Sequence, residues 1–156
     1  MKRICKILVF TLLLFTLYGC SASEKETTGA PVDLAELLIA SIDFPEMLLI
    51  TQERVGRFYP AAVTTNMSHS LIYLSAETIE ADEIAIFQAS SKEHAATVKA
   101  ALNAHYLERI ALFASYAPHE AERIRQRMVI EQDRWLIIVI SDDPQTSERI
   151  VNGWFK

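Results

Sequence analysis

Cysteine is almost absent from this chain, which has only two, Cys5 and Cys20, among 156 residues. Both lie within the first twenty residues, so a domain formed by the rest of the chain contains no thiol. This excludes disulfides, cysteine nucleophiles, CxxC redox centres, iron–sulfur clusters and cysteine-ligated zinc from that domain. Its stability must therefore come from a hydrophobic core.

Glycine is also scarce, and after Asp33 only Gly56 and Gly153 remain. Loops that bind phosphate need several closely spaced glycines, because backbone amides must approach the ligand. The sequence therefore excludes a P-loop, a dinucleotide-binding fingerprint and a Gly-x-Ser-x-Gly nucleophile elbow. We expect no cofactor.

The first nineteen residues have the pattern of a bacterial export signal. Three basic residues precede an apolar run over 7–18, which as a helix would span only about 18 Å of a bilayer core of about 30 Å. The run is thus too short for a membrane span and indicates a cleaved signal peptide over 1–19. The ending Leu17-Tyr18-Gly19-Cys20 resembles a lipobox, which makes Cys20 the expected lipidation site.

The stretch 20–32 is polar and without hydrophobic periodicity, which is typical of a flexible tether. We therefore predict a protein held by lipid on Cys20 at the extracytoplasmic face of the cell membrane. Without its signal the chain keeps 12 basic and 20 acidic residues, a formal net charge of −8. Because such a surface repels polyanions, we expect no nucleic-acid partner.

Hydrophobic periodicity then predicts one domain over 33–156. Asp33-Leu34-Ala35-Glu36 has the form of a capping box and predicts a first helix ending near Pro45, with a second short helix within 46–59. Apolar runs over 71–76 and 83–89 predict a hairpin, and Ser90 to Glu93 predicts the cap of a long helix. Pro118 permits a further helix to about Gln126.

A second hairpin is predicted from strands over 128–132 and 135–141, joined by Asp133 and Arg134. Asp143 followed by Pro144 indicates the start of a last helix. The order predicts an α+β fold: an antiparallel sheet of about four strands from two hairpin-plus-helix (ββα) units, preceded by an N-terminal helix.

Several short segments resemble a bacterial lipoprotein family of unknown function, of the Gram-positive type. They are Pro45-Glu46-Met47, the segment 81–87, the trio Phe113, Tyr116 and Pro118, the segment 141–143, and Phe155. The resemblance implies a lipid anchor and a single domain, and brings no known activity, cofactor or catalytic residue. On the long helix this family often has arginine and glutamine one turn apart, where this chain has His105 and Arg109.

The histidines do not form a convincing catalytic or metal site. His94 and His105 would stand about 16 Å apart on one helix, too far to share an ion, although Glu108 lies near His105. His69 lies between two serines, but no glycine elbow accompanies it. We predict no metal ligand and no catalytic residue.

The densest basic cluster is Arg123, Arg125 and Arg127. Helical spacing pairs Glu120 with Arg123 and Glu122 with Arg125, which indicates a solvated, salt-bridged face. The same three arginines are the candidate contact for an acidic partner.

Taken together, these patterns predict a non-catalytic interaction module of the cell envelope that binds a protein or a cell-wall component. The alternatives are a hydrolase that uses carboxylates or the scattered histidines, and a lipoprotein that binds a small molecule.

Overall fold

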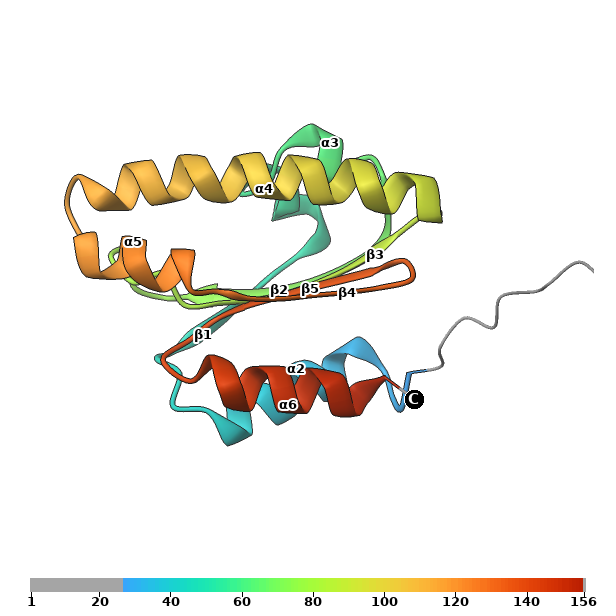
Figure 1. The fold of residues 1–156 in the computed structure, drawn as a ribbon, viewed down its shortest axis with the longest axis horizontal. Helices are drawn as coiled ribbons and strands as arrows, with labels where there is room; N and C mark the ends of the chain where they lie inside the picture. Colours follow the sequence, from blue (N-terminus) through green and yellow to red (C-terminus); the bar gives the residue numbers. More distant parts are fainter. Residues whose placement is uncertain (1–26, 156) are drawn as a thin grey trace, which may run out of the picture.

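The computed structural model describes residues 27–155 and has an α+β fold in three layers (Figure 1). The middle layer is a five-stranded antiparallel sheet in the order β1-β2-β3-β5-β4. Helices α4 and α5 lie on one face of the sheet, and α2 and α6 lie on the other. The predicted signal over 1–19 and the lipidation site Cys20 lie outside the described residues.

The elements follow one another as α2 (Pro31–Ser41), β1 (Met47–Ile50), the 3₁₀ helix η2 (Gln52–Arg57), α3 (Ala61–Thr64), β2 (Met67–Ser75), β3 (Glu83–Ala89), α4 (Lys92–Ala114), α5 (Pro118–Arg125), β4 (Met128–Gln132), β5 (Trp135–Ile140) and α6 (Pro144–Trp154).

The predicted count of four strands in two ββα units is wrong, because β1 adds a fifth strand. Its residues Met47 to Ile50 pair antiparallel with β2 at the start of the segment 46–59, and the short helix predicted within that segment is present only as the 3₁₀ helix η2. Methionine and leucine favour helices in isolation, so the local signal was misleading. Pairing with β2 outweighs that preference, and the first half of the sheet therefore has three consecutive strands.

Two helix starts differ from the prediction, and one agrees with it. Helix α2 begins at Pro31, and Asp33 stands in its first turn, where it accepts a hydrogen bond from the Ala30 N–H at 2.9 Å. Ser91, rather than Ser90, caps α4 by accepting from the His94 N–H at 3.2 Å. The predicted cap of α6 is confirmed, since the Asp143 carboxylate accepts from the Thr146 N–H at 2.9 Å.

Strands β3 and β5 are covered on both faces, as their unbroken apolar sequences predict. On β3, Ile84 and Ile86 pack with α2 and α6, whereas Ala85, Phe87 and Ala89 pack with α4. The predicted interior position of β5 is confirmed, because it pairs with both β3 and β4.

The predicted hairpin between β4 and β5 is also confirmed. Asp133 and Arg134 form the connection, and Asp133 has φ 53°. Two-residue hairpins favour this left-handed conformation, and aspartate tolerates it better than most residues.

The buried position of Ile138 generates a stability prediction. Its side chain is 2% exposed in the core between the sheet and α4. We expect Ile138→Ala to lower the free energy of unfolding in urea by about 2–5 kcal/mol, through lost burial and a cavity. The control Val129→Ala, on an edge strand and 48% exposed, should change it by about 0.5 kcal/mol or less. A loss below about 1 kcal/mol for Ile138→Ala would contradict the packing described for β5.

Candidate functional site

A buried carboxylate at the start of β3 is the centre of the first polar cluster, which we name the Glu83 network. The Glu83 side chain is fully buried. Its Oε1 accepts hydrogen bonds from the Tyr59 hydroxyl at 2.6 Å and from the Tyr106 hydroxyl, and its Oε2 accepts from Arg109 Nη1. The network therefore joins β3 to α4 and to the residues that follow η2.

The protonation states in the Glu83 network follow from burial and charge. Burial and the nearby charge of Glu83 raise the pKa of Tyr59 and Tyr106 well above the ordinary value, so both hydroxyls keep their protons and donate. Burial alone would lower the pKa of Arg109, but the charge of Glu83 outweighs this effect and the pKa is raised. Arg109 thus remains a cation beside the carboxylate.

A small pocket of about 90 Å³ lies beside this network and is lined by Phe58, Tyr59, Leu74, Glu83, His105 and Arg109. The His105 ring lies 5.0 Å from the Tyr59 ring, centroid to centroid. Burial lowers the pKa of His105, against the opposing charge of Glu83, so its imidazole is neutral at pH 7. Because both oxygens of Glu83 already accept hydrogen bonds, the carboxylate is poorly placed to act as a general base.

A second cluster, the Asp82 network, surrounds Arg123 of α5. Its guanidinium binds Asp82 in a bidentate pair, with Nη2 2.6 Å from Oδ1 and Nη1 2.9 Å from Oδ2. Nη1 also lies 2.8 Å from Glu120 Oε2, and Nε lies 2.8 Å from Asp142 Oδ1, although without hydrogen-bond geometry. The same Glu120 oxygen accepts from the Ala81 N–H at 2.8 Å. The network thus ties α5 to the β2–β3 loop and to the end of β5.

In the Asp82 network, burial and ion pairing have opposite effects on the pKa values of Asp82 and Arg123. Burial raises the pKa of Asp82, although Arg123 acts to lower it. Burial acts to lower the pKa of Arg123, but its hydrogen bonds to Asp82 and the charge of that carboxylate raise it. Arg123 therefore stays charged and connects the carboxylates of Asp82 and Glu120. It is not available for proton transfer.

The three arginines predicted as a partner contact are placed in different surroundings. The predicted pairs Glu120–Arg123 and Glu122–Arg125 are confirmed. The predicted solvation of Arg123 is wrong, because its side chain is only 12% exposed, whereas that of Arg125 is 49% exposed. Arg127 lies over the Tyr106 ring, with Cζ 4.6 Å from the centroid.

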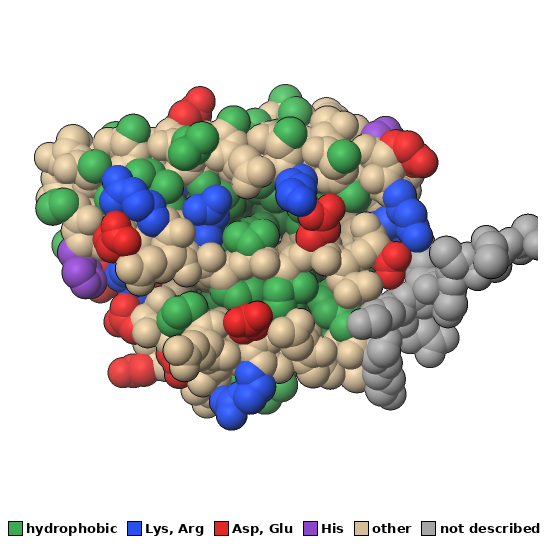
Figure 2. Space-filling model, in the orientation of Figure 1, with side chains coloured by type: hydrophobic (Ala, Val, Ile, Leu, Met, Phe, Trp, Pro, Cys, Tyr) green, Lys and Arg blue, Asp and Glu red, His purple; other side chains and the backbone are tan. Residues whose placement is uncertain are grey.

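The arginines therefore do not form one exposed patch, and their contact with a partner stays a prediction. On the face of the molecule in view in Figure 2, basic and acidic side chains alternate, and hydrophobic side chains gather between the two helical layers.

The histidines are likewise separated. His69 of β2 and His94 at the start of α4 are exposed, whereas His105 lines the small pocket beside the Glu83 network. Within residues 27–155, no group of three or more His, Cys, Asp or Glu side chains is placed to hold a metal ion. In the same range, no helix is both long enough and apolar enough to cross a membrane.

One edge of the sheet, which we name the β1 edge, is apolar and open. Glu46 C=O accepts from the Ala76 N–H, so Leu48 and Ile50 turn their backbone groups toward β2 in the alternating antiparallel pattern. The backbone groups of Met47 and Leu49 therefore point outward. Leu48 is 47% exposed and Leu49 is 49% exposed.

The opposite edge of the sheet is formed by β4, which carries a charged side chain. The hairpin register turns the backbone groups of Val129 and Glu131 outward. Glu131 forms an ion pair with Lys99 of α4 at 2.5 Å. Charged side chains on an edge strand discourage pairing with another strand, and the β1 edge lacks this protection.

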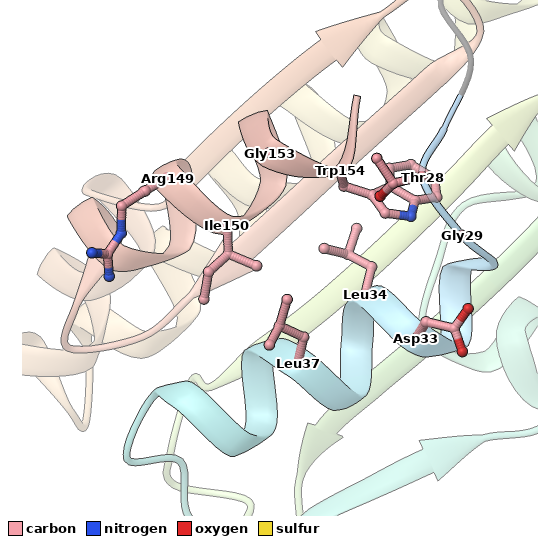
Figure 3. Close-up of a pocket in the computed structure, with 9 residues that line it drawn as sticks. All are labelled: Thr28, Gly29, Asp33, Leu34, Leu37, Arg149, Ile150, Gly153 and Trp154. Carbon is pink, nitrogen blue, oxygen red and sulfur yellow. The ribbon is translucent and has the colours of Figure 1, made fainter. Parts of the chain in front are cut away.

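A groove of about 370 Å³ lies between α2 and α6 (Figure 3). Leu37 and Ile150 point toward one another across it, and Trp154 stands near Thr28 at one end. The Thr28 N–H donates to the Trp154 carbonyl at 2.7 Å, so both ends of the described chain meet here. A Cβ added at Gly153 in the groove wall would meet nothing within 4 Å.

Comparison with known protein families identifies a match. A family model described as Domain of unknown function (DUF4358) matches residues 40–141. No curated protein and no solved structure matches the chain. The matched range contains the Glu83 network, the β1 edge and all of the Asp82 network except Asp142, whereas the residues that line the groove lie outside it.

The difference in burial between Arg123 and Arg125 can be tested by measuring stability. Arg123→Met would leave Asp82 buried without its cation, and we expect the free energy of unfolding to fall by about 3–5 kcal/mol. Arg125→Met removes an exposed pair with Glu122 and should cost about 0.5 kcal/mol or less. Urea unfolding of both variants measures the difference, and equal losses would contradict the placement of Arg123.

Proposed function

Because the chain belongs to the DUF4358 family, whose description assigns no function, we propose a function from its own residues. The protein is a lipid-anchored, extracytoplasmic module of the cell envelope that binds another protein and catalyses no reaction. The observation that carries this proposal is the β1 edge, an open strand with exposed leucines on both faces of the sheet.

The β1 edge has the properties of a strand-addition site. Its outward backbone groups can pair with an extended segment, and its apolar side chains supply contacts on both sides of the sheet. Between Met47 and Gln52 there is no charged residue and no proline to prevent pairing. Since the edge is apolar, it favours a protein over a polar cell-wall glycan as the partner.

The alternatives have less support. A hydrolase at the small pocket lacks a free base, because Glu83 is engaged by three donors, and the raised pKa of Tyr59 keeps it protonated. Binding of a small molecule is favoured by the α2–α6 groove, whose volume lies within the usual range of about 300–1,000 Å³ for ligand sites. That groove lies outside the range that matches the family.

The membrane anchor is supported by the signal pattern that ends at Cys20. Thr27, the first described residue, pairs with Phe155 in a β-bridge beside α6. A tether that precedes Thr27 would therefore leave the domain from the α2–α6 layer. At least two acyl chains on a bacterial lipidated cysteine would make the attachment long-lived.

The anchor can be tested in the full-length chain. Cys20→Ser should release the protein from the membrane fraction, or leave an uncleaved precursor, because the lipid can no longer be attached. Cell fractionation and labelled palmitate measure the two effects. Palmitate that remains on the Cys20→Ser protein would contradict the lipidation site.

The binding surface can be tested with a photo-crosslinking residue in place of Leu49, in the full-length chain in its own membranes. Irradiation should give a covalent adduct with a protein, because that side chain lies on the open edge. The same residue in place of Val129, equally exposed on the charged β4 edge, is the matched control. Adducts of equal yield from both positions, or none from Leu49, would exclude the β1 edge as the binding surface.

A further inference from the structure

We infer that the partner at the β1 edge is a second copy of this chain, paired strand to strand about a two-fold axis. This inference rests on the proposed function, since it names the protein that the same edge binds. In the pair, two five-stranded sheets become one continuous antiparallel sheet.

The register of this pairing follows from the backbone. Met47 and Leu49 are the residues whose N–H and C=O groups point outward, so they must supply the new hydrogen bonds. In a symmetric antiparallel pair, the backbone N–H and C=O groups of Met47 form hydrogen bonds with those of Leu49 in the second copy. By symmetry, the backbone groups of Leu49 form hydrogen bonds with those of Met47 in the second copy. Leu48 then stands directly opposite Leu48 of the second copy, in a non-hydrogen-bonded position.

In this register, the apolar side chains of β1 lie next to apolar side chains of β1 in the second copy. Leu48 lies on the α4 face of the sheet with Ile50, and Leu49 lies on the α2–α6 face with Met47. Pairing therefore buries Leu48 against its own copy on one face, and Leu49 against Met47 on the other. Both leucines are about half exposed in the single chain, and the segment 47–52 places no like charges opposite one another.

The position of the tether agrees with a two-fold pair on one membrane. The axis that relates two antiparallel edge strands runs perpendicular to the sheet, so both copies keep their α2–α6 layers on the same side. Thr27 is held in that layer by its bridge to Phe155. Both tethers would therefore leave toward the same bilayer.

Confinement to a membrane also compensates for the shortness of β1. Four residues per copy form a small interface compared with the roughly 800 Å² per partner of a stable complex in solution. Two anchored copies meet at a raised effective concentration, which strengthens a weak contact. Since each mature chain carries a formal net charge of −8, salt should strengthen the pair by screening repulsion between the copies.

The test uses Leu48→Cys in the full-length chain, oxidised in its own membranes. Opposite residues in non-hydrogen-bonded positions have Cα atoms about 4.5 Å apart, within the range of a disulfide. We expect a disulfide-linked dimer in at least tenfold higher yield than with Leu49→Cys. In this register the two copies of residue 49 are diagonal neighbours at about 7–8 Å, beyond disulfide reach.

Two further proteins serve as controls for disulfide formation away from the β1 edge. Val129→Cys places a cysteine on the β4 edge at similar exposure, and the parent chain reports any dimer formed through its own cysteines. Neither should form the dimer. Absence of a dimer from Leu48→Cys, or equal yields from Leu48→Cys and Leu49→Cys, would overturn the pairing.

The Leu49 photo-adduct separates this inference from the proposed function. An adduct with twice the mass of the chain supports the second copy. An adduct with a different protein, together with a monomeric Leu48→Cys chain, overturns the second copy and leaves the binding function standing. Absence of any adduct and of any disulfide overturns both.

Discussion

The buried charge of Glu83 is the constraint on which the rest of the structure depends. A fully buried carboxylate is strongly unfavourable unless hydrogen bonds and an opposite charge compensate it. Tyr106 and Arg109 of α4, together with Tyr59, supply that compensation, so α4 and the chain after η2 must lie over β3. These groups cover the centre of the sheet, whereas β1 is an outer strand beyond β2. The compensation of one buried charge therefore fixes how α4 packs on the sheet, and the proposed binding surface lies outside that contact.

The sequence predicts the interior strands well, because β3 and β5 carry unbroken apolar runs whose faces can be separated by their period of two. It does not predict the Glu83 network, whose donors lie 23, 24 and 26 residues away in the chain. Such distant pairing leaves no local pattern, and the only available signal is a charged residue at the start of an apolar strand. Likewise, nothing in the periodicity of α5 distinguishes the buried Arg123 from the exposed Arg125, because Asp82 is contributed by a different part of the chain.

The two helical layers differ in their relation to the family. The α4–α5 layer, the five strands, the Glu83 network and all of the Asp82 network except Asp142 lie within residues 40–141, whereas α6 and most of α2 lie outside that range. The proposed contact surface thus belongs to the part of the chain that matches the family. The groove between α2 and α6 is formed by side chains outside the matched range. A ligand in that groove would be a property of this chain and would not follow from membership of the family.

The layer of α2 and α6 is built from the two ends of the described chain. During synthesis from the N-terminus, α2 is the first of the described helices to emerge, but its packing partner α6 comes last. Leu34 and Leu38 of α2 share their core with Val151 and Trp154 of α6. Contacts between residues so distant in sequence are slow to form, because the long loop between them must first be closed. The face of the sheet under α2 and α6 therefore stays incompletely covered until α6 has been synthesised, and a chain truncated before Pro144 would remain exposed to aggregation and proteolysis.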